Sequence, residues 1–80
     1  MKSAVELRKA IRASALALNL KHVKIYEDFD DGMQVVEITH VENDMEICYL
    51  GVSNEGWSLE DALAYVDGSL RMDLMEAVNV

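Results

Sequence analysis

The sequence lacks the residues that mark several common protein classes. Its 80 residues include no proline and one cysteine. A single cysteine cannot form an internal disulfide, which indicates a reducing compartment such as the cytoplasm. No apolar run is long enough for a signal peptide or a membrane anchor, and there is no linker, repeat or low-complexity tract. These absences predict one compact, soluble domain over residues 1–80.

Basic residues are scarce and unevenly placed. Seven Lys and Arg face fifteen Asp and Glu, which gives a net charge of −8. Residues 1–24 hold six of the cations and one carboxylate, a net charge of +5, whereas residues 25–80 hold fourteen carboxylates and Arg71, a net charge of −13. Because the acidic part repels nucleic acid, direct DNA binding is not expected. The simplest interpretation is that a basic helix packs near acidic strands, while the surplus acid maintains solubility.

Helical periodicity marks both ends of the chain. Ser3 and Glu6 form a capping-box pattern before an apolar stripe that runs to about residue 18, and Asn19 is expected to end this helix. A second stripe follows the N-cap Ser58 and keeps its register to residue 77, which predicts one helix continuous through Gly68. The alternative is a break at Gly68, since an interior glycine costs a helix about 1 kcal/mol relative to alanine.

Three strands are predicted between the helices. An alternating pattern begins at Val23, and further strands cover about 33–41 and 45–53. Asp31-Gly32 and Asn43-Asp44 are typical of two-residue hairpin turns. The fold class is therefore α+β, a two-layer αβββα domain whose three-stranded antiparallel meander packs against an N-terminal and a C-terminal helix.

The expected turns also predict which strand residues lie opposite one another. They place Ile25 beside Ile38 and Ile38 beside Tyr49, on the face that would pack against the helices. Val23, Val36, His40 and Ile47 would join this face. The opposite face would carry Tyr26, Val35, Thr39, Val41, Cys48, Leu50 and Val52, mixed with Lys24, Glu37 and Glu46. A slip of one residue would exchange the two faces.

Two apolar surfaces remain after the predicted core is assigned. One is the opposite face of the sheet, from which we select Tyr26, Val35, Leu50 and Val52 as interface candidates. The other is a stripe on the C-terminal helix formed by Tyr65, Gly68, Met72 and Met75. The methionines could instead fill gaps in the core if the helix breaks at Gly68. Two surplus apolar surfaces on one small domain favour a partner or self-association.

The residues that could serve catalysis or metal binding do not have the spacing that such sites require. Counted from Asp28, the fifth position of a calcium loop is Gly32 itself and the twelfth is a threonine. A nucleophilic Cys48 needs a base such as His40, which the expected pairing places on the other face. His22 and His40 also fall on opposite faces and form no metal pair. We therefore predict no enzyme activity, no cofactor and no metal site.

Carboxylates are concentrated in the sheet region, where they could attract a basic partner or replace the phosphates of a nucleic acid. Nine of the fifteen lie between residues 27 and 55. The candidates for electrostatic contact with a partner are Asp28, Asp30, Asp31, Glu37, Glu42, Asp44 and Glu46.

In size, acidity and αβββα order, the whole chain is similar to small phage-encoded inhibitors, which include anti-CRISPR and anti-restriction proteins. The resemblance implies a phage-encoded inhibitor that acts in the cytoplasm of a host cell. Together with the charge, it predicts a non-enzymatic interaction module that binds the basic surface of a nucleic-acid-binding protein or complex, with DNA mimicry as one form. The alternative is a homodimeric structural or assembly subunit that associates through the helix stripe or the sheet face.

Overall fold

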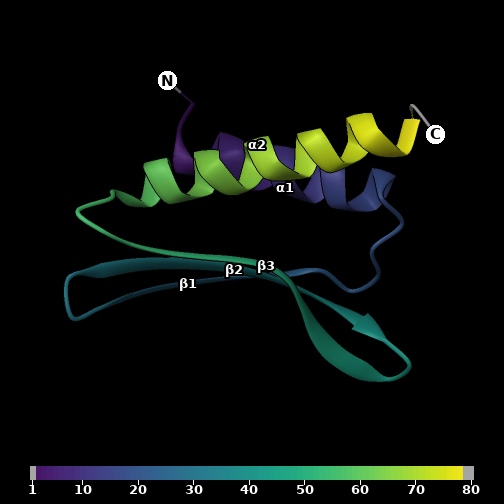
Figure 1. Cartoon of the computed structure of the whole chain (residues 1–80), viewed down its shortest axis with the longest axis horizontal. Helices are drawn as coiled ribbons and strands as arrows, with labels where there is room; N and C mark the ends of the chain where they lie inside the picture. The colour runs from purple at the N-terminus through teal and green to yellow at the C-terminus, as the bar shows by residue number, and fades with distance from the viewer. Residues whose placement is uncertain (1, 79–80) are drawn as a thin grey trace.

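A three-stranded sheet forms one layer of the protein and two helices form the other (Figure 1). The computed structural model describes residues 2–78. Its elements are α1 (Ala4–Ala17), β1 (Lys24–Asp30), β2 (Met33–Glu42), β3 (Met45–Glu55) and α2 (Leu59–Val78). The strands are antiparallel in the order β1-β2-β3, which confirms the predicted αβββα fold.

Both ends of α1 are closed by local hydrogen bonds. The Ser3 hydroxyl accepts from the Glu6 amide at 3.2 Å, and the Glu6 carboxylate accepts from the Ser3 amide at 3.1 Å. Asn19 has a φ of 64°, and the Leu20 amide donates to the Ala15 carbonyl at 3.0 Å. This is a Schellman-type ending, in which asparagine tolerates the left-handed conformation. The capping box and the terminating role of Asn19 are confirmed.

The two hairpin turns are those predicted from sequence. Asp31 and Gly32 have φ values of 53° and 78°, and Asn43 and Asp44 have values of 53° and 64°. Positive φ at both central residues matches the right-handed twist of the flanking strands. These turns set the register next to them, and β1 pairs with β2 as predicted.

A bulge in β3 changes the predicted pairing with β2. Thr39 lies opposite Cys48, but the next residue back, Ile38, lies opposite Leu50, so Tyr49 is an extra residue on β3. The expected pairing of Ile38 with Tyr49 is therefore wrong. One inserted residue shifts the two-residue alternation of everything that follows it. The second half of β3 consequently presents the opposite set of side chains to the helices.

The core lies between the sheet and the helices. α2 runs through Gly68 without a break, so the continuous helix is confirmed, and its first turn is closed where the Asp61 amide donates to the Ser58 hydroxyl at 3.1 Å. Apolar side chains of both helices meet those of β2 in one cluster. Its fully buried members are Ile11, Val36, Ile38, Ala62, Leu63, Val66 and Leu70.

One ion pair joins the basic helix to the acidic sheet. The Arg8 Nε donates to Glu27 Oε2 at 2.6 Å and Nη2 donates to Oε1 at 2.8 Å. This two-point contact lowers the pKa of the Glu27 carboxyl. Within residues 2–78, no helix is long and apolar enough to cross a membrane.

Candidate functional site

The face of the sheet that points away from the helices is uncovered (Figure 1). We call it the open face, and the strand pairing places acidic, polar and apolar side chains on it together. Tyr26 lies opposite Glu37, and Asp28 lies opposite Val35. Tyr26 is 45% exposed and Cys48 is also exposed. The open face therefore presents apolar side chains to solvent between carboxylates.

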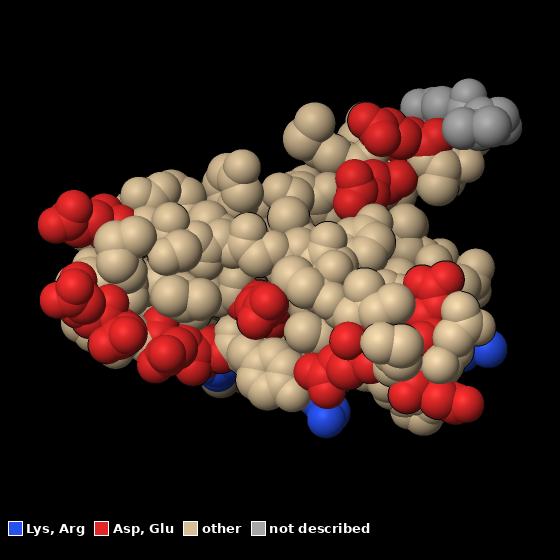
Figure 2. All heavy atoms as spheres, turned by 60° about the horizontal axis from the view of Figure 1, so that its bottom comes forward, with Lys and Arg blue, Asp and Glu red and all other residues tan. Residues whose placement is uncertain are grey.

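The seven predicted acidic contact residues are distributed over the open face and the hairpin ends. Four share the open face: Asp28, Asp30, Glu37 and Glu46. Asp31 and Asp44 lie in the two turns, and Glu42 pairs with Met45 next to the second turn. Figure 2 shows acidic side chains toward both ends of the molecule, with few basic ones among them. The alternation of the strands thus places four of these seven carboxylates on the open face, and the other three lie at the hairpin ends.

Glu46 is held in place by three neighbouring side chains. The Tyr26 hydroxyl donates to it and lowers its pKa most, followed by the Thr39 hydroxyl, which donates at 2.9 Å. Lys24 Nζ lies 3.6 Å from the Glu46 carboxylate. Glu46 is therefore an ordered, partly balanced charge.

Cys48 is the only thiol in the chain and lies on the open face. Its hydrogen bond with Glu37 raises its pKa, and burial adds to the rise. His40 pairs with Ile47 and sits edge-on to Tyr49 with ring centroids 6.0 Å apart, on the covered side. The thiol is thus kept protonated beside a carboxylate and away from the imidazole, an arrangement that opposes nucleophilic attack.

Two of the predicted interface residues lie on the covered face. Leu50 pairs with Ile38 and Val52 pairs with Val36, and both pack against the core. Their expected position on the open face is wrong, because the bulge shifts the alternation of β3. Tyr26 and Val35, which lie on the other two strands, keep their expected face.

The predicted stripe on α2 is exposed. Tyr65, Met72 and Met75 are 53%, 63% and 64% exposed, and we call them, with Gly68, the α2 stripe. The ring of Tyr65 lies 5.5 Å from that of Trp57. A shallow depression of about 520 Å³ follows the stripe and is lined by Ala64, Tyr65, Gly68, Ser69, Arg71 and Met72.

Asp67 is a buried carboxylate that the sequence analysis did not identify. It is 2% exposed, its Oδ2 lies 3.4 Å from Arg71 Nη2, and its Oδ1 has no hydrogen-bond partner. The available signal was its position one turn after the core residue Leu63 in a continuous helix. The consequence is that Arg71, the one cation after residue 24, is already paired within α2.

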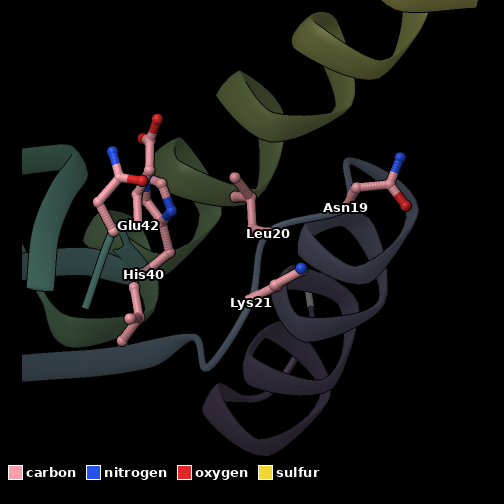
Figure 3. A pocket seen from close by; sticks show the side chains of 7 residues that line it. Asn19, Leu20, Lys21, His40 and Glu42 are labelled. Carbon is pink, nitrogen blue, oxygen red and sulfur yellow. The ribbon is translucent and has the colours of Figure 1, made fainter. Parts of the chain in front are cut away.

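A second hollow lies where the end of α1 approaches the β2–β3 hairpin (Figure 3). This open cleft measures about 420 Å³ and is lined by Asn19, Leu20, Lys21, His40, Val41, Glu42 and Asn43. The Val41 amide donates to the Lys21 carbonyl at 2.9 Å and so joins the two segments that line the cleft. Figure 3 shows Lys21 and Asn19 on the α1 side, apart from His40 and Glu42, with Leu20 between them.

Two further observations concern possible metal binding and similarity to known proteins. Over residues 2–78, no three or more His, Cys, Asp and Glu side chains are grouped so that they could hold a metal ion. Comparisons with protein-family models, curated proteins and solved structures find no match.

Proposed function

We propose that this protein is a non-enzymatic interaction module, an inhibitor that docks its acidic sheet surface on the basic surface of a nucleic-acid-binding protein or complex. The observation that carries the proposal is the collection of carboxylates on the open face and at both turns. Among the described residues of the open face, Lys24 is the one cation, and it is already paired with Glu46.

The chemistry of the open face suits a protein partner. Tyr26 supplies exposed aromatic area, and Val35 and Val41 on the same face are half-buried. Carboxylates on the open face and at its two ends attract a basic surface and raise the rate of encounter, while the apolar side chains between them supply affinity after docking.

The density of charge favours protein docking over full replacement of a nucleic acid. From Val41 to Met33 the open face spans about 27 Å at roughly 3.4 Å per residue. Duplex DNA of that length carries about sixteen phosphates. The open face has five carboxylates over the same span: Asp28, Asp30, Glu37, Glu46 and Glu55. DNA mimicry in the strict sense therefore has less support than an acid-rimmed interface.

Removal of charge from the hairpin ends tests the proposal. In one variant Asp30, Asp31 and Asp44 become Asn and Glu42 becomes Gln. Asparagine tolerates the left-handed backbone conformation that Asp31 and Asp44 adopt in the turns. A partner captured by the wild type from a nuclease-treated bacterial lysate should bind this variant at least about fourfold more weakly, since four exposed ion pairs contribute about 0.2–1 kcal/mol each. Its salt dependence should also be shallower.

A matched control removes four charges from α2 by the corresponding amide changes at Glu60, Asp61, Asp73 and Glu76. This control has the same net charge and should retain the affinity of the wild type for that partner. Equal weakening in both variants would reduce the proposal to a general effect of net charge. Capture of a partner only from lysate that has not been treated with nuclease would exclude the proposal.

The alternative function is a homodimeric assembly subunit. Its support is the exposed α2 stripe, where three large apolar side chains lack a covering element. Two copies would nevertheless bring together chains with a net charge of −8 each, which opposes association.

A further inference from the structure

The α2 stripe has a glycine at its centre that the fold does not require. A Cβ added at Gly68 would meet nothing within 4 Å. Glycine in a helix interior costs about 1 kcal/mol relative to alanine, and α2 continues for ten residues beyond it. Gly68 lines the depression of about 520 Å³ together with Tyr65 and Met72. A residue that weakens the helix and opens its surface suits close approach by another chain.

The large side chains of the stripe suit an adaptable apolar contact. Tyr65 and Met72 are separated by two turns of helix, and Met75 follows one turn later, so all three lie along one side. Methionine is flexible and polarisable, and it is often used on surfaces that accept amphipathic helices.

Charge determines which occupant fits this surface. Asp61 stands one turn before Tyr65 and Glu76 one turn after Met72, so a carboxylate lies at each end of the stripe, about 22 Å apart at 1.5 Å per residue. Arg71 is paired with the buried Asp67. A second copy would oppose carboxylate to carboxylate with no additional Lys or Arg on α2 to balance them. The complementary occupant is therefore basic.

We infer that the α2 stripe binds an amphipathic helix of another protein, with its apolar side against Tyr65, Met72 and Met75 and its cations near Asp61 and Glu76. This surface belongs to the helix layer. The inference therefore does not depend on the acidic open face or on the function proposed for it.

The methionines allow a direct test. The full chain carries methyl-labelled methionine and is titrated with a synthetic amphipathic helix of leucine and lysine, while NMR follows the methyl signals. The signals of Met72 and Met75 should shift, and those of Met33 and Met45 in the sheet should stay. Fluorescence of Trp57, which contacts Tyr65, should change in parallel. A scrambled peptide of the same composition, with no apolar side, is the control.

Variants separate docking from folding. Met72→Gln and Gly68→Leu place good helix formers in α2, and each should lower peptide affinity about tenfold or more, because the first removes an apolar contact and the second fills the depression. Met45→Gln, at a 66% exposed sheet residue, is the matched control and should bind as the wild type does. The variant with amides at the four hairpin positions should retain peptide binding, which separates this inference from the proposed function.

Three results would overturn the inference. The first is equal binding of the scrambled peptide, which would indicate attraction by net charge alone. The second is a set of methyl shifts confined to Met33 and Met45. The third is a wild-type dimer in sedimentation that Met72→Gln converts to a monomer, because a second copy would then occupy the stripe.

Discussion

The covered and open faces of the sheet are built from alternate residues of the same three strands, yet they differ in chemistry. Val36 and Ile38 are fully buried against the helices, whereas Glu37, between them, points to the open face beside Cys48. α2 repeats the division, with Leu63 and Leu70 buried on one side and Met72 exposed on the other. Burial on the covered sides stabilises the fold, so the exposed sides can serve contacts with other molecules.

The bulge in β3 provides the largest expected difference between the two faces. Leu50→Lys places a charge against the core and should lower the free energy of unfolding by about 2–3 kcal/mol. Cys48→Lys, on the open face beside Glu37, should change it by less than about 1 kcal/mol. Urea unfolding of both variants measures the difference. Without the bulge Leu50 would lie on the open face, and its substitution would then be tolerated.

Gly68 tests the exposed side of α2. Gly68→Ala should raise the free energy of unfolding by about 1 kcal/mol, because alanine favours the helix and the new Cβ meets no neighbour within 4 Å. Thermal unfolding followed by circular dichroism measures the change. A loss of stability would mean that Gly68 ends a helix and that the α2 stripe is interrupted there.

Glu27 is an acidic residue on the covered face of the sheet, and its substitution should have the smallest effect on stability. Its hydrogen bonds from Arg8 lower its pKa in the folded protein, so it adds stability above its unfolded pKa and loses it as the pH falls through the folded value. Between about pH 5 and pH 3, wild type should therefore lose more stability than Glu27→Gln. Thermal unfolding of both proteins across this pH range measures the difference in stability.

Arg8→Gln is the matched variant for this pH dependence, since it removes the other partner of the same ion pair. It should flatten the profile as Glu27→Gln does. If both variants keep the steep profile of the wild type, the acid sensitivity arises from other carboxylates.

Local patterns predicted most of the fold and part of the candidate site. The capping box at Ser3 and the left-handed residue Asn19 closed α1 as expected, because such signals act within one turn of helix. The stripe of Tyr65, Met72 and Met75 was also found from helical spacing. The positions of Leu50 and Val52 were predicted wrongly, because a bulge depends on how two paired strands pack against the core and not on the local sequence alone. Asp67 was missed for a related reason, since its burial depends on the packing around α2.

The sequence by itself determined the elements, their order, the two turns and the split between a basic start and an acidic remainder, because each depends on neighbouring residues or on simple counts. Only the tertiary structure decided which face β3 presents, that Arg8 meets Glu27, and that Asp28, Asp30, Glu37 and Glu46 share one uncovered surface. These features join residues far apart in the chain. They arise when burial of the core selects one register, and the polar side chains then take the positions that this register leaves them.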